Sequence, residues 1–217
     1  MVNSLMTLVA MLDLLTIYPL TIHRSPKGVL YTYTFQSLLV ASIPAALYLQ
    51  TRQVEQLILC ALLILIKSVI IPAFIIRRNI KYAAKSVEPK LAVNYAVGIS
   101  SVTAVILFTL VLFYQILPPS FGGATRIVAV SGFSYAAACI LVLSFRRYAE
   151  SQILLLLCVE NGILLASLVM IPMIPILAEV IIAFETFVAV ITLAWLNHHM
   201  RYVFGHTDTF EMKDLRG

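Results

Sequence analysis

Seven long apolar segments, separated by short polar connections, dominate this chain of 217 residues. A helix needs about 20 consecutive apolar residues to cross the hydrocarbon core of a bilayer, and each segment has roughly that length. Hydrophobic residues make up 61% of the chain and charged residues only 12%, whereas about a quarter of the residues in a soluble domain are charged. The sequence therefore predicts an all-α integral membrane protein and leaves no room for a soluble domain of useful size.

We predict about seven transmembrane helices from the apolar segments and from the Pro and Gly residues between them. The expected helices span residues 3–22, 30–50, 56–76, 94–117, 127–145, 152–172 and 175–197. We expect the first helix to be retained, because it lacks a basic leader region and carries Asp13 within its apolar stretch. The chain then divides into an N-terminal four-helix region (1–126), a three-helix region (127–197) and a polar tail (198–217).

Most basic residues of the loops lie on one side of the predicted membrane. Lys and Arg in short loops favour the cytoplasmic side. Of the 15 basic residues, two (Arg52 and Arg126) lie on one side and Lys67 lies within a helix. The other 12 are Arg24, Lys27, Arg77, Arg78, Lys81, Lys85, Lys90, Arg146, Arg147, Arg201, Lys213 and Arg216. We therefore predict an outside N-terminus and a cytoplasmic C-terminus. The net charge of +5 is interpreted as a topology signal, and no nucleic-acid partner is expected.

Five charged residues (Asp, Glu, Lys or Arg) lie within the predicted helices: Asp13, Lys67, Glu160, Glu179 and Glu185. A charge near the bilayer centre costs at least about 2.5–3.5 kcal/mol, so such residues usually face protein or water and mark ion or proton pathways. Lys67 lies too deep for its ammonium to reach the headgroups by snorkelling. Its own helix offers no carboxyl within one turn, so we expect a partner on another helix, with Asp13 as the in-chain candidate and Glu160 as the alternative. The lysine either relays protons or forms a purely structural ion pair.

Glu160 and Glu185 are predicted on adjacent antiparallel helices joined by a tight hairpin. Helix rise places them about 12 Å and 18 Å from the cytoplasmic end, a difference of about 6 Å in height. A carboxyl in a low-dielectric site can be tuned to take up and release a proton near neutral pH. We favour proton exchange by this pair over a role limited to holding the helices together. Asn161 follows Glu160, and Gly162 allows another backbone to approach closely.

The remaining polar residues give weaker signals. Glu179 lies about one turn from the outer end and about 120° around the helix from Glu185, so it can reach interfacial water. Asp13, Glu179 and Asn161 are therefore secondary candidates, and a functional and a structural role for Asp13 are equally open. The adjacent His198 and His199 point about 100° apart and do not chelate a metal together. Because no nucleotide-binding, serine-hydrolase or zinc-peptidase motif occurs, we predict no active site, cofactor or metal in this chain.

Two segments near the C-terminus resemble subunit K of respiratory complex I. The segment V-E-N-G-I-L-L-A, which contains Glu160, is similar to the second helix of that subunit. The segment F-E-T-F-V-A-V-I-T-L-A-W-L-N-H-H, which contains Glu185, is similar to its third helix. Subunit K has three spans, carries one intramembrane glutamate in each of these two helices, and ends in the cytoplasm. The likeness covers about residues 127–197, and the whole chain more loosely resembles component E of hydrogenase-4.

The resemblance implies a multi-pass subunit of the cell inner membrane, within the membrane arm of a redox-driven ion pump. Such complexes are of the group 4 nickel–iron hydrogenase or formate hydrogenlyase type, and their redox cofactors belong to other subunits. Expected partners are other membrane-arm subunits, including antiporter-like ones that connect to a cytoplasmic hydrogenase-like arm. Glu160, Glu185 and Lys67 are the expected proton-transfer residues, for protons or sodium ions.

Three other classes of function stay open at this point. The chain could belong to a multisubunit cation/proton antiporter, or it could be a purely structural assembly subunit. An independent secondary transporter is the third class, but no repeated pair of Pro- or Gly-broken helices is evident in the sequence to mark its binding site.

Overall fold

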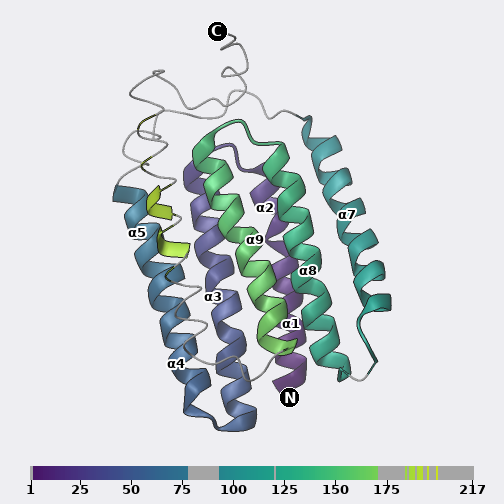
Figure 1. Cartoon of the computed structure of the whole chain (residues 1–217). Helices are drawn as coiled ribbons and strands as arrows, with labels where there is room; N and C mark the ends of the chain where they lie inside the picture. Colours follow the sequence, from purple (N-terminus) through teal and green to yellow (C-terminus); the bar gives the residue numbers. More distant parts are fainter. Residues whose placement is uncertain are drawn as a thin grey trace.

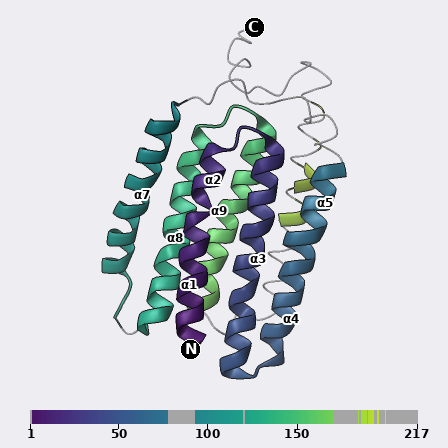
Figure 2. The same ribbon diagram turned by 180° about the vertical axis from the view of Figure 1, so that it is seen from behind.

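The computed structural model describes residues 2–77, 93–119 and 121–170, and beyond them residues 184, 186–188, 190–192, 195 and 199. Six helical segments in these ranges are long and apolar enough to cross a membrane. They run side by side in one bundle (Figures 1 and 2). The described residues thus have the fold of an all-α, multi-pass membrane protein. The seventh predicted helix, residues 175–197, falls mostly outside them.

The six spans lie within a few residues of their predicted positions. The first consists of α1 (Val2–Leu15) and α2 (Ile17–Ile22), the second of α3 (Pro26–Thr51), and the third of α4 (Val54–Leu63), the π-helix η1 (Ile64–Ile70) and α5 (Ile71–Ile75). The last three are α7 (Tyr95–Ile116), α8 (Gly123–Ser144) and α9 (Ala149–Met170). Helix α3 starts four residues before the predicted position because Pro26 suits the first helical turn and the Ser25 hydroxyl caps it by accepting from the N–H of Gly28 at 3.2 Å.

Helices α8 and α9 form the centre of the bundle, and they make the most extensive pairing in it. Helices α1 and α3 pack against this pair, whereas α7 lies at the periphery (Figure 1). Large apolar side chains cover the outer surface, for example Phe108 and Leu107 on α7. A lipid environment suits such a surface, because the bilayer core is itself apolar.

Helices α8 and α9 approach most closely at two glycines. A Cβ atom on Gly132 would lie 2.6 Å from the carbonyl oxygen of Gly162, and a Cβ on Gly162 would lie 2.9 Å from that of Gly132. An alanine follows each glycine four positions later (Ala136 and Ala166), a spacing that lets membrane helices pack backbone to backbone. The close approach expected at Gly162 is thus confirmed. It fixes the backbone of α9 next to Glu160.

Two spans are interrupted near buried charged residues. The first span breaks at Thr16, whose N–H and hydroxyl both donate to the carbonyl oxygen of Asp13, at 3.0 and 2.7 Å. Pro19 has no N–H to offer to the carbonyl of Leu15, four residues earlier, which weakens the helix at the same point.

The third span widens into the π-helix η1, which contains Lys67. At its end the N–H of Ile71 bonds to the carbonyl of Ile66, five residues back. Pro72 follows and cannot donate to the carbonyl of Ser68, so the regular α-helical ladder is already broken there. Lys67 and Ser68 are the residues of η1 that face the bundle interior.

The loops gather at the two ends of the bundle as the predicted topology requires. At one end Gln50 donates to the side chain of Asn3 at 2.6 Å, which places the N-terminus beside the turn that carries Arg52. At the other end Arg146 donates to the carbonyl of His23 at 2.6 Å and to that of Leu20. Arg146 is only 1% exposed. It caps the C-terminus of α2, where a cation opposes the partial negative charge of the helix end.

Substitution of Gly162 by Ala should destabilise the bundle by about 1–3 kcal/mol, the usual cost of overpacking. The added methyl group would meet backbone atoms of α8, so the two helices would have to separate. We expect a lower melting temperature of the purified chain in detergent, followed by circular dichroism. Gly123→Ala is the matched control, because a Cβ at Gly123 meets no atom within 4 Å. Equal melting temperatures for the two variants would contradict the close contact.

Candidate functional site

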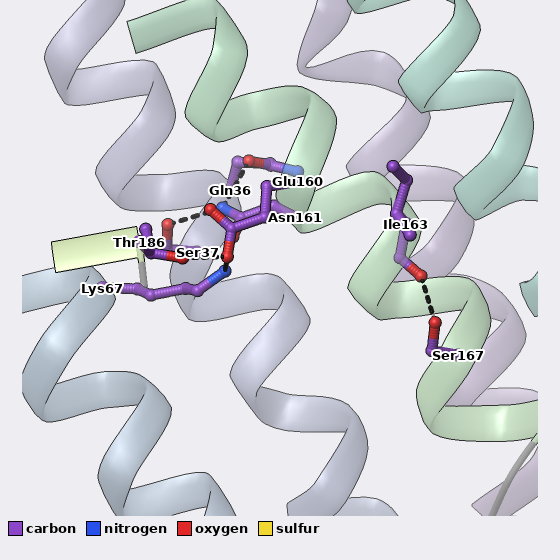
Figure 3. Close-up of polar contacts among 8 residues, drawn as sticks. All are labelled: Gln36, Ser37, Lys67, Glu160, Asn161, Ile163, Ser167 and Thr186. Atoms are coloured by element: carbon purple, nitrogen blue, oxygen red, sulfur yellow. Dashed lines mark hydrogen bonds and ion pairs between the residues drawn. The ribbon is translucent and has the colours of Figure 1, made fainter. Parts of the chain in front are cut away.

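Two charged side chains from different spans meet inside the bundle. Lys67 Nζ lies 2.7 Å from Glu160 Oε1 (Figure 3), and the side chains are 3% and 27% exposed respectively. The prediction that Lys67 finds its partner on another helix is confirmed, but our first candidate, Asp13, was wrong. Helix α1, which carries Asp13, packs against α3 and α8, whereas η1 packs against α3. The partner is Glu160, the alternative on α9.

Asn161 links this ion pair to α3. Its Oδ1 accepts a hydrogen bond from Lys67 Nζ at 2.9 Å. Its Nδ2 donates to Gln36 Oε1 at 2.9 Å and to Ser37 Oγ at 2.8 Å. Both amide hydrogens are therefore used. The amide has only one good orientation, since turning it over would point N–H groups at the lysine ammonium. Asn161, a secondary candidate in the sequence, is thus a full member of the site.

The hydroxyl of Thr186 also donates to Glu160 Oε1, at 2.5 Å. Thr186 belongs to the predicted seventh helix. The ring of the next residue, Phe187, packs edge-on against Phe74 of α5, with the centroids 6.3 Å apart. The described residues of this segment thus lie beside α5 and α9, next to the ion pair. Glu185 and Glu179, which we predicted in the same helix, lie outside the described residues.

Hydrogen bonds surround both charges of the pair. A buried ion pair recovers its desolvation cost only when further polar groups satisfy the remaining donors and acceptors. Here Asn161 bonds to the ammonium, and Thr186 bonds to the carboxylate. Moving one proton along the 2.7 Å contact would convert the ion pair into a neutral amine and a neutral acid. Both forms are compatible with a low-dielectric site, so the geometry allows a proton to change hands between Lys67 and Glu160.

Gln36, Ser37 and Thr186 belong to the site but were not among our candidates. A search for charged residues does not find them, because all three are neutral. Gln36 and Ser37 do form an adjacent polar pair in the middle of the apolar segment 30–50, and this pair is the signal that could have revealed them. Thr186 offers no comparable signal, since Ser and Thr in helices often bond only to their own backbone, as Thr32 does here.

Asp13 belongs to α1, which packs against α3, the helix against which η1 also packs. It is 1% exposed, and neither of its carboxyl oxygens has a hydrogen-bond partner among the described residues. Its carboxyl interacts with the side chain of Gln36, but the two groups do not reach hydrogen-bonding geometry, and Gln36 Nε2 also lacks a partner in those ranges. Asp13 is thus a neighbour of the site through Gln36.

Comparisons with protein-family models, with curated proteins and with solved structures gave no match to this chain. The resemblance of two segments to subunit K, and of the chain to component E, therefore stays a prediction. Within the described ranges, no group of three or more His, Cys, Asp and Glu residues could hold a metal ion. What defines the site is the ion pair between a buried lysine and a partly buried glutamate.

Removing one partner of the pair should destabilise the protein more than removing both. Lys67→Met leaves a carboxylate without its cation, and Glu160→Gln leaves an ammonium without its anion. Each loss costs about 3–5 kcal/mol in a buried pair, and we expect the lower end because Glu160 is 27% exposed. The double variant should lose less than either single variant. Unfolding in mixed detergent micelles measures the free energies, and Lys27→Met, at an exposed lysine, is the control. Additive losses would show that the two side chains do not interact.

Proposed function

We propose that this chain is a membrane-arm subunit of a redox-driven ion-pumping complex, related to complex I and of the group 4 nickel–iron hydrogenase or formate hydrogenlyase type. In this proposal it helps to carry protons, or sodium ions, through the middle of the cell inner membrane. The observation that supports it most is the pair formed by Lys67 and Glu160 within the bundle, with a distance of 2.7 Å.

A buried pair of this kind is a poor way to stabilise a membrane protein. Each charge costs at least about 2.5–3.5 kcal/mol at the bilayer centre, and well-packed apolar residues often stabilise a protein as well or better. Four further polar side chains are nevertheless arranged around this one contact. Asn161 and Thr186 bond to the pair, and Gln36 and Ser37 bond to Asn161 (Figure 3). The presence of so many polar groups around one ion pair favours a functional role for the pair.

The unequal exposure of the two side chains indicates where a neighbouring subunit would connect. Lys67 is enclosed, whereas about a quarter of the Glu160 side chain is open, at 27%. A carboxyl that is held on one side and open on the other can pass a proton between the lysine and a group outside this bundle. In the proposed complex, that outer group belongs to an adjoining membrane-arm subunit. The electron-transfer cofactors also belong to partner subunits.

A purely structural role is the second candidate, and the complete hydrogen bonding of Asn161 supports it. An amide with every donor and acceptor engaged rigidifies its surroundings and can serve to fix three helices in register.

A subunit of a cation/proton antiporter would use the same ion pair as a redox-driven pump. It would differ in its partners.

The charge-neutral double variant Lys67→Met with Glu160→Gln should assemble but lose most ion pumping, because it keeps the packing and removes both titratable groups. The tagged chain is purified from its native membrane with its partners, which intact-complex mass spectrometry identifies. Proton uptake into vesicles is then followed with a pH-sensitive dye. We expect a hydrogenase-like large subunit among the partners and at least a tenfold loss of pumping.

The control for that experiment is Glu55→Gln, since Glu55 is an exposed carboxyl at the start of α4. It should pump like the unchanged protein. Full pumping by the double variant would instead favour the structural role. Antiporter-like partners without any redox subunit would replace the proposed complex by a cation/proton antiporter.

The orientation predicted from the basic residues can be tested with two exposed positions at opposite ends of the bundle. In a background without the native cysteines, Arg52→Cys should react with an impermeant maleimide that is added to intact cells. Lys27→Cys should react only after the membrane is opened, because its end is predicted to face the cytoplasm. The reverse pattern of labelling would show that the chain has the opposite orientation.

A further inference from the structure

Asp13 is a buried carboxyl whose role the ion pair does not explain. It lies near the middle of the first span, between α3 and α8, and is 1% exposed. Within the described ranges its oxygens have no hydrogen-bond partner, and Lys67 bonds to Glu160 and not to Asp13. Burying an ionised carboxylate without a cation costs far more than burying a neutral acid. A carboxyl in the middle of the membrane is therefore expected to be protonated, or to have a function that requires its charge.

Two amide side chains connect Asp13 to the ion pair. Starting from Lys67 on η1, the ammonium donates to Asn161 of α9, and Asn161 donates to Gln36 of α3. Gln36 Nε2 has no hydrogen-bond partner in the described ranges. The Gln36 side chain also interacts with Asp13 of α1. Figure 3 shows this line from Lys67 as far as Gln36. Four side chains from four helical segments thus cross the bundle.

The two amides point in the same direction along this line. Each accepts with its carbonyl oxygen on the side of Lys67, and Asn161 donates with its nitrogen on the side of α3. Aligned dipoles polarise one another in a low-dielectric interior. A positive charge at Lys67 therefore makes the potential at Gln36 Nε2, next to Asp13, more positive, and the loss of that charge makes it less so. Amides carry no titratable proton themselves, so the line transmits a field and not a proton.

The backbone around Asp13 provides a second indication. The break between α1 and α2 lies at Thr16, whose hydroxyl donates to the carbonyl of Asp13 and lies 3.2 Å from the hydroxyl of Tyr135, within hydrogen-bonding distance. Non-regular backbone at membrane depth is tolerated where it is covered by protein or lines a polar cavity. Two titratable side chains of α8, Tyr135 and Cys139, face Asp13. Asp13 is thus placed in a polar part of the interior that reaches α8 as well as α3.

We propose that Asp13 is a second proton-binding site, and that Gln36 and Asn161 couple its protonation to the charge state of Lys67 and Glu160. The Asp13 carboxylate gains or loses one proton, which is exchanged with water, and no other bond changes. A role for Asp13 in ion translocation rests on the function proposed above. The coupling between the two sites does not.

Infrared spectroscopy tests the proposal on the full chain in lipid nanodiscs. The chain contains three aspartates, Asp13, Asp208 and Asp214, and the last two belong to the predicted polar tail. With carbon-13 in aspartate alone, the C=O stretching band of a buried carboxylic acid reports on Asp13. The band should be present at low pH and disappear as the pH rises. Asp13→Asn should remove it, and Asp208→Asn should leave it unchanged.

The coupling predicts opposite shifts from the two halves of the ion pair. Lys67→Met should move the midpoint of the band's titration to higher pH, and Glu160→Gln should move it to lower pH. Asn161→Leu should reduce both shifts by at least half, because it interrupts the line of amides. An absent band, a band that does not titrate, or a midpoint that neither variant moves would each overturn the proposal.

This readout does not depend on transport, so the two proposals can fail separately. Coupled titration together with full pumping by the Lys67→Met, Glu160→Gln double variant would retain the second site and reject the pump. Lost pumping with an uncoupled Asp13 would do the opposite. Lys27→Met, which changes an exposed lysine, should leave the midpoint in place and controls for a general effect of charge.

Discussion

The polar side chains in the middle of the bundle are arranged around one contact, the ion pair between Lys67 and Glu160. Two charges cannot remain in a bilayer interior unless other groups replace the water that they have lost. Asn161 and Thr186 supply those groups, and Asn161 in turn is held by Gln36 and Ser37. The requirement to satisfy one lysine therefore explains why polar residues occur in the middle of spans that are otherwise apolar.

The contact can be maintained because the helix that carries Glu160 is held firmly. Gly162, two residues further along α9, packs against Gly132 of α8 with no space for a side chain on either residue. Lys67, by contrast, sits in a π-helix, where the regular hydrogen-bond ladder is already disturbed. One partner of the pair is thus held at the centre of the bundle, and the other belongs to a segment whose α-helical hydrogen-bond ladder is interrupted.

Much of this could be predicted from the sequence, and the remainder had definite physical causes. Apolar length located the six described spans, and the cost of a buried charge identified Lys67, Glu160 and Asp13. Their pairing could not be derived, since residue numbers do not show that α3 lies between η1 and α1. Neutral members such as Gln36 escaped a search for charges. Glu185 and Glu179 lie outside the described residues, so their place in the site stays a prediction.

The π-helix also determines which residues of the third span face the bundle interior. The buried residues Leu59, Leu63, Lys67, Ile71 and Ile75 recur at every fourth position. In a regular α-helix four residues overshoot a full turn by about 40°, so four such steps would place Ile75 about 160° away from Leu59, almost facing the lipid. The wider turns of η1 advance fewer degrees per residue and cancel this drift. The π-helix thus keeps Lys67 and its apolar neighbours on the same face of the span, from one side of the membrane to the other.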